Sequence, residues 1–165
     1  MAALTGDNNK ISLIGGAIKI QGPCNSADTY FNGALLFALN VHHGTPTGLV
    51  TCLPTLSAID VFLGICAKQV TTTAASQPVE YFVGGIWLFP QPTAAVTSVS
   101  IGDYLIMLKG GTVTDSCMDL VIGGAAPTAT SAIIGQIVGM DASSNLFVNL
   151  SLGGTGVAAA NSALR

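Results

Sequence analysis

The sequence predicts an all-β protein, a compact antiparallel β-barrel or sandwich in which a jelly-roll order is one option. Helical periodicity is hard to find along the 165 residues, whereas short apolar runs bounded by Gly, Pro, Asn or Asp recur. Such punctuation is typical of all-β domains. About eight strands at intervals of roughly 10 to 20 residues suit a closed barrel or sandwich better than a parallel α/β sheet.

The strand pattern is carried by the segments 10–21, 33–41, 60–70, 78–89, 103–108, 133–140 and 146–152. The first segment is broken at Gly15–Gly16, and the fourth has a bulge or bend at Gly84–Gly85. Residues 141–145 read as a tight hairpin connection, and Asp103 as a turn residue that opens a strand. Residues 56–62 are the only short helical candidate.

Alternation is clearest in the last segment. One face there carries Leu146, Val148, Leu150 and Leu152, and the other carries Phe147, Asn149 and Ser151. This period of two predicts a strand with one buried face.

Charged side chains are scarce: five Lys or Arg and eight Asp or Glu make up 8% of the chain, against about 25% in an ordinary soluble domain. Charge keeps copies of a protein apart. Gly, Ala, Ser and Thr are abundant, and half of the chain is apolar. So thin a coat of charge predicts a subunit of an assembly, covered by identical copies or by a partner.

Two classes of partner fit the sequence poorly. Nucleic-acid binding needs clustered Lys and Arg, but these residues are scattered singly and the net charge is −3. The uncharged run 81–102 contains Gly84, Gly85, Pro90 and Pro92, so it does not predict a membrane-spanning helix. The N-terminus lacks the basic segment and apolar core of a signal peptide, so we expect synthesis and use in a cytoplasm.

Few residues could carry chemistry, and no catalytic motif is present, so we expect neither an enzyme nor a bound cofactor or metal. His42 and His43 fit a turn after a strand, with catalysis or metal binding as the alternative. Asp115 and Asp119 fit a solvated loop, with a weak cation site as the alternative. Glu80 is the only glutamate, and a paired-carboxylate mechanism would need a second acid brought close by folding.

The four cysteines, Cys24, Cys52, Cys66 and Cys117, contain no close pair of the CxxC kind used by zinc sites. We expect thiols packed in the core. A disulfide among them is the alternative, although a cytoplasmic protein gives it little support.

The densest aromatic patch consists of Tyr81, Phe82, Trp87 and Phe89. Core filling is one interpretation. The alternative is an interface anchor or a platform for sugar stacking, since aromatic side chains are favoured at both.

We expect three parts: an N-terminal arm with the first strand at 1–22, a β-barrel core at 23–152, and a flexible C-terminal tail at 153–165. Polar residues 1–9 and the small-residue tail cannot bury enough apolar surface to order themselves. At least one arm is therefore expected to become ordered on a neighbouring molecule.

Five segments occur in a specific order within residues 60–152: VFLGICAKQVT, PVEYFVGGIWLFP, SVSIGDYLIM, AIIGQIVGMD and NLFVNLSL. This order resembles small capsid decoration (cement) proteins of tailed bacteriophages. The corresponding residues are Gly64; Val79, Gly85 and Pro90; Gly102 and Asp103; Ile134 and Gly135; and Val148 with Leu150. Two regions depart from the family, because 1–58 is longer than expected and 111–127 looks like an insertion.

The resemblance implies a subunit that is made in the host bacterial cytoplasm and forms a homotrimer on the outside of an icosahedral head. It would lie over contacts between major capsid proteins and resist internal DNA pressure. No catalytic residue is implied. The aromatic patch stays a candidate oligomer or capsid interface on the chemistry of its own side chains. The main alternative is a carbohydrate- or receptor-binding β-domain, such as a head-fibre or lectin-like module; a weaker one is a β-barrel enzyme.

Overall fold

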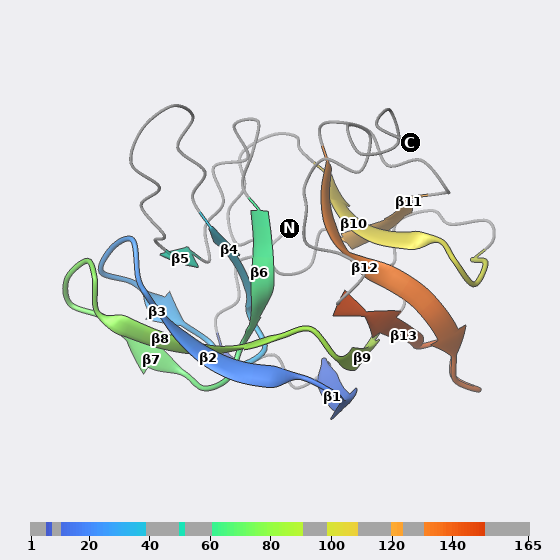
Figure 1. The fold of residues 1–165 in the computed structure, drawn as a ribbon, viewed down its shortest axis with the longest axis horizontal. Helices are drawn as coiled ribbons and strands as arrows, with labels where there is room; N and C mark the ends of the chain where they lie inside the picture. The colour runs from blue at the N-terminus through green and yellow to red at the C-terminus, as the bar shows by residue number, and fades with distance from the viewer. Residues whose placement is uncertain are drawn as a thin grey trace.

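The computed structural model describes residues 6–7, 11–38, 50–51, 61–90, 99–108, 120–123 and 131–150. These residues are almost entirely strands and their connections, and no α-helix lies among them (Figure 1). The all-β prediction is confirmed. The sheets are antiparallel and do not close, so the architecture is consistent with a sandwich built from open sheets.

Sheet A has six strands in the order β1-β9-β13-β12-β10-β11. Their bounds are β1 Ser12–Gly15, β9 Ile86–Phe89, β13 Leu146–Asn149, β12 Ser131–Met140, β10 Tyr104–Leu108 and β11 Leu120–Gly123.

Sheet B has five strands in the order β2-β8-β6-β4-β5. Their bounds are β2 Ile18–Pro23, β8 Pro78–Val83, β6 Val61–Cys66, β4 Leu35–Ala38 and β5 Val50–Thr51. A small third sheet pairs β3, Thr29–Tyr30, with β7, Val70–Thr71.

Two ribbons pass from one sheet to the other. The edge ribbon is β1 followed by β2, and the inner ribbon is β8 followed by β9; the inner ribbon's passage between the sheets can be followed in Figure 1. Each ribbon bends at a pair of glycines, as predicted, with φ of +78° at Gly16 and +81° at Gly85. A Cβ placed on Gly16 would lie 3.6 Å from the Gly85 Cα, so the two bends are in contact.

The main core joins sheets A and B. Trp87, Phe89 and Leu105 of sheet A are buried with Phe37 and Phe62 of sheet B, whose two rings make an edge contact at 5.8 Å. A second cluster contains Leu36, Cys66 and Tyr81 of sheet B with Tyr30 of β3. Neighbours such as Leu35 and Leu36 fall in different clusters because successive side chains point to opposite faces of a strand.

The local pattern was a good guide where strands are long. Leu146, Val148 and Leu150 are buried while Phe147 and Asn149 are half-buried, as the alternation predicted; Leu152 lies outside the described residues. Asp103 accepts a hydrogen bond from the Ser100 N–H at 2.8 Å, and Asp141 accepts from the N–H groups of Ser143 and Asn145. Both predicted turns are confirmed.

The pattern missed β3, β5 and β11. The first two have only two residues each, too few to show a period. Strand β11 lies within 111–127, the segment predicted as an insertion, and pairs along β10. Of the helical candidate 56–62, Val61 and Phe62 belong to β6, where pairing with β4 overrides the local signal, and the other residues lie outside the described part.

Candidate interaction surface

The four aromatic residues singled out from the sequence all lie on the inner ribbon, but Trp87 and Phe89 belong to the main core, against which Phe82 packs, and Tyr81 belongs to the second cluster. Tyr81, Trp87 and Phe89 are buried, and the Phe82 and Trp87 rings are 5.6 Å apart. The Trp87 indole N–H donates to the Gly84 carbonyl at 3.0 Å, and burial raises the pKa of the Tyr81 hydroxyl. In the single chain three of the four fill the core; an interface role stays a prediction for Phe82, which is half-buried.

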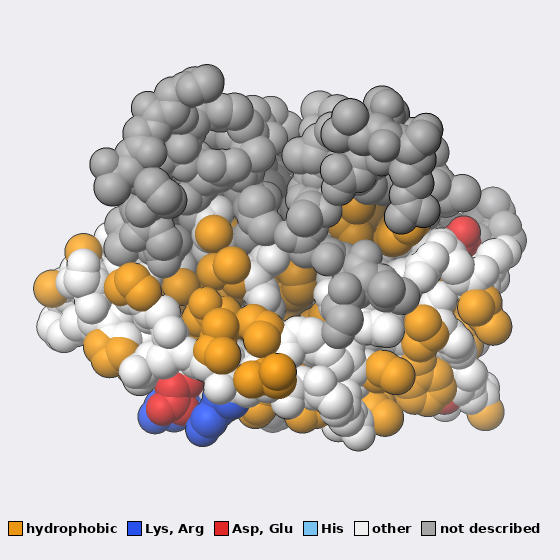
Figure 2. All heavy atoms as spheres, viewed as in Figure 1, with side chains coloured by type: hydrophobic (Ala, Val, Ile, Leu, Met, Phe, Trp, Pro, Cys, Tyr) orange, Lys and Arg blue, Asp and Glu red, His pale blue; other side chains and the backbone are white. Residues whose placement is uncertain are grey.

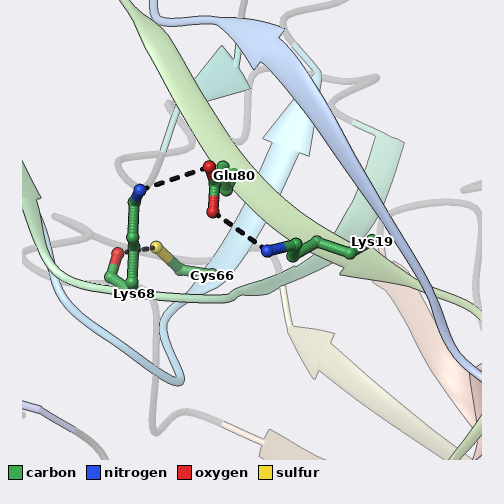
Figure 3. Close-up of polar contacts among 4 residues, drawn as sticks. All are labelled: Lys19, Cys66, Lys68 and Glu80. Atoms are coloured by element: carbon green, nitrogen blue, oxygen red, sulfur yellow. Dashed lines mark hydrogen bonds and ion pairs between the residues drawn. The ribbon is translucent and has the colours of Figure 1, made fainter.

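Glu80 lies between two lysines (Figure 3). Its carboxylate oxygens accept from Lys68 Nζ at 3.2 Å and from Lys19 Nζ at 3.4 Å. The hydrogen bond from Lys68, followed by the contributions of Lys19, holds the pKa of Glu80 below its ordinary value. The pair of interactions links β2 to β8 and to the turn after β6, and brings no second acid to Glu80.

The thiols of Cys24 and Cys66 are buried and are not in a disulfide. Each donates to a backbone carbonyl, Cys24 to Ala74 at 3.2 Å and Cys66 to Lys68 at 3.1 Å. The prediction of core thiols is confirmed for these two, and Cys52 and Cys117 lie outside the described residues.

His42, His43, Asp115 and Asp119 also lie outside the described residues, so their loop and site interpretations stay predictions. Where the chain is described, no three His, Cys, Asp or Glu side chains come together in a way that could hold a metal ion. The same ranges contain no helix long and apolar enough to span a membrane.

The edge ribbon carries the most exposed cluster of large apolar side chains. Ile18 is 66% exposed, Ile14 56%, Ile20 40% and Leu13 39%. Strand β1 is an outer strand of sheet A and β2 an outer strand of sheet B, which leaves these side chains covered on one side only. Figure 2 shows hydrophobic side chains over the region of β2, β6 and β8, while the Lys and Arg atoms in view gather at one place on the lower edge.

Sheet A presents a second apolar surface, which we call the outer face of sheet A. Its central part consists of residues directly opposite one another: Leu88 faces Phe147, and Ile86 faces Asn149. Asn149 in turn faces Gln136 on β12. All five are at least partly exposed, whereas Trp87 and Phe89 point to the opposite, buried face. These five residues provide apolar side chains and two amides, with no charged group among them.

Sequence reasoning missed both surfaces. It predicted a strand segment at 10–21, but not that this segment lies at the edge of the sheets. The available signal was the lone Lys19 among isoleucines, because a lysine on an apolar strand is a common way to mark an edge.

Comparisons with protein-family models, with curated proteins and with solved structures found no match for this chain.

Proposed function

We propose that this chain is a structural virion protein that decorates and stabilises an icosahedral phage capsid as a homo-oligomer, with a trimer as the expected assembly. The observation that carries the proposal is the pair of exposed apolar surfaces, the edge ribbon, in which Lys19 is the one charged residue, and the outer face of sheet A. A decoration subunit needs one contact with its own copies and another with the shell, and isolated proteins rarely leave such areas bare.

The low charge of the whole chain supports the same function. Only thirteen of 165 side chains are charged, which leaves little repulsion between copies. Extended, repeated contacts suit this composition better than a single ligand pocket. The order of segments that resembles cement proteins adds the virion, and the outer surface of the capsid, to this argument.

A carbohydrate- or receptor-binding domain is the second candidate. It would present exposed aromatic rings, but Tyr81, Trp87 and Phe89 are buried. The half-buried Phe147 beside the amides of Asn149 and Gln136 is the part of the described surface that best fits a sugar. A glycan array with the purified protein tests this candidate directly.

The decisive test is cryo-electron microscopy of the source particle together with rebinding of purified protein to heads stripped of it. We expect density for the chain on the outer shell, and Ile86→Lys to weaken rebinding about tenfold because it places an ammonium group on an apolar contact. Ile101→Lys is the matched control, since Ile101 is 73% exposed in a turn. Absence of the chain from the particle refutes the proposed function.

A further inference from the structure

The backbone hydrogen bonds of β2 show which of its residues direct their N–H and C=O groups toward β8 and which direct them to the open side. The Cys24 N–H donates to the Gln77 carbonyl at 2.8 Å, on the side of β8. In an antiparallel ladder the N–H and C=O of one residue point to the same side, and the side alternates along the strand. Ile20 and Ile18 therefore share the direction of Cys24, while the backbone groups of Lys19 and Gln21 point away from β8.

A second hydrogen bond, made by β8, gives the same assignment of backbone directions. The Ala67 N–H donates to the Glu80 carbonyl at 2.9 Å, so the backbone of Glu80 faces β6 and that of Tyr81 faces β2. Tyr81 lies directly opposite Ile20, which agrees with the assignment from Cys24. Lys19 and Gln21 are exposed, and no strand of the described ranges pairs with their outer side.

The open stretch has a clear end. The backbone of Asn25 points to the same side as those of Lys19 and Gln21, and its N–H donates to the Val50 carbonyl at 2.8 Å. Pro23 has no N–H to offer. The edge available for pairing is therefore 17–23.

We propose that this edge of β2 pairs antiparallel with β2 of a second copy across a two-fold axis at Ile20, joining two copies of sheet B into one sheet. Residues whose backbone points outward must face each other, which allows Lys19 to lie opposite Gln21 of the second copy. The register with Lys19 opposite Lys19 is disfavoured, because like charges directly opposite each other repel.

The proposed register explains the exposed isoleucines. Ile20 faces Ile20 of the second copy, so an apolar row runs from Tyr81 through both isoleucines to Tyr81 of the other sheet. Ile18, the most exposed of the large apolar side chains on the edge ribbon, lies directly opposite Gly22 of the second copy. The exposed edge strand β2 thereby becomes an inner strand of the joined sheet.

Charge complementarity favours a second copy as the occupant. Gln21 lies directly opposite Glu80 within each copy, so Lys19 of one copy comes within two strand spacings, about 10 Å, of Glu80 in the other. Long Lys and Glu side chains can span that distance. Each carboxylate would then be shared between its own lysines and one from the second copy.

The contact is small. Residues 17–23 provide seven residues per copy, against about 20 to 30 on each side of a standard interface. We therefore expect a concentration-dependent association. This contact is independent of the proposed function, because it needs no capsid; since a two-fold contact joins only two copies, the expected trimer would form through other surfaces.

Cysteine substitutions measure the register, in a protein whose Cys52 and Cys117 are replaced by Ser. Directly opposite residues have Cβ atoms about 4.5–5.5 Å apart, close to disulfide geometry, so Ile20→Cys should give a covalent dimer on mild oxidation. Ile18→Cys should not, because its two copies lie about 13 Å apart along the ladder. Because the β2 edge of one copy pairs with the β2 edge of one other copy only, the cross-linked product is a dimer, whatever contacts form elsewhere on the protein.

Two further variants test the association itself by analytical ultracentrifugation. Gln21→Pro keeps the bonds to β8, since its N–H points away from them, and should weaken association at least about tenfold. Ile20→Lys should do the same by placing two ammonium groups across the axis, whereas Ile101→Lys should leave association unchanged. Circular dichroism verifies that each variant is folded.

Failure of Ile20→Cys to cross-link, equal cross-linking of Ile18→Cys, or unchanged association of Gln21→Pro and Ile20→Lys overturns this proposal. If these variants lose capsid binding but Ile20→Cys gives no dimer, the edge accepts a strand from another protein and the second copy is wrong. If the protein cross-links as expected but binds no capsid, this inference stands and the proposed function is wrong.

Discussion

The edge ribbon and the inner ribbon have similar sequences and opposite environments. The edge ribbon reads SLIGGAIKIQGP and the inner ribbon PVEYFVGGIWLF, each with an apolar segment on both sides of a Gly-Gly pair. Among the described strands, the inner ribbon is paired on both sides in both sheets, while the edge ribbon is paired on one side only. As a result Trp87 and Phe89 are buried, and Ile18 and Ile14 are largely exposed.

This difference teaches that sheet position, more than side-chain hydrophobicity, decides burial here. An exposed isoleucine contributes little to folding stability, because burial is what yields its transfer free energy. Evolution can therefore place such residues at an edge for association without a large effect on the isolated fold. The predictions below test whether the two ribbons differ in energy as they do in structure.

The largest difference is expected between Phe89→Ala and Ile18→Ala. Phe89 is fully buried in the main core, so its truncation should lower the free energy of unfolding by about 3–5 kcal/mol. Ile18→Ala should change it by less than about 0.5 kcal/mol, measured by urea denaturation at a concentration where copies do not associate. Similar losses for the two variants would show that the edge ribbon is more deeply packed than the exposed fractions indicate.

The next difference is expected at the two bends. Gly85 has φ of +81°, and a Cβ there would lie 2.7 Å from both the Ala17 nitrogen and the Gly15 oxygen. Gly85→Ala should cost at least about 2 kcal/mol, from backbone strain and from this clash. Gly15→Ala is the control, because nothing lies within 4 Å of the Cβ it would add, and its melting temperature should stay within a few degrees of wild type. A tolerated Gly85→Ala would mean that the bends can move apart.

The smallest effect is expected from the two ion pairs of Glu80, of which the one with Lys19 joins the two ribbons. The pKa of Glu80 is lowered from its ordinary value of 4.5 by Lys68 and Lys19. Its contribution to stability is therefore present above the unfolded-state pKa and is lost as the pH falls through the lower folded-state pKa. Melting temperatures from pH 6 to pH 3 should fall less steeply in Glu80→Gln than in wild type.

Salt separates this contribution from that of Asp141, whose pKa is lowered mainly by the hydrogen bond from the Asn145 amide. Added salt should reduce the Glu80 contribution, since exposed charge pairs are screened. The difference between Asp141→Asn and wild type should persist in salt, because it rests on the geometry of a turn. A Glu80→Gln difference that is unchanged by salt would contradict the ion-pair interpretation.

By itself the sequence determined the all-β class, both glycine bends, the turns at Asp103 and Asp141, and the buried face of the strand at 146–149. These features depend on alternation and turn chemistry within a few residues, so they can be predicted without knowing what pairs with what. The core thiol of Cys66 was predictable for a similar reason, because it lies in an apolar run, whereas Cys24 is buried although Gly, Pro, Asn and Ser surround it in the sequence.

Tertiary structure decided which strands are edges, and with them the candidate surface. Glu80 and Lys19 are 61 residues apart in the chain. Strand β1 likewise pairs with β9, which is far from it in the sequence. Apart from the single lysine among the isoleucines of β2, such long-range pairing leaves little local trace, so both Trp87 and Ile18 appear in the sequence only as apolar residues after a Gly-Gly pair. Only the order of strands places one of them in the core and leaves the other at an open edge.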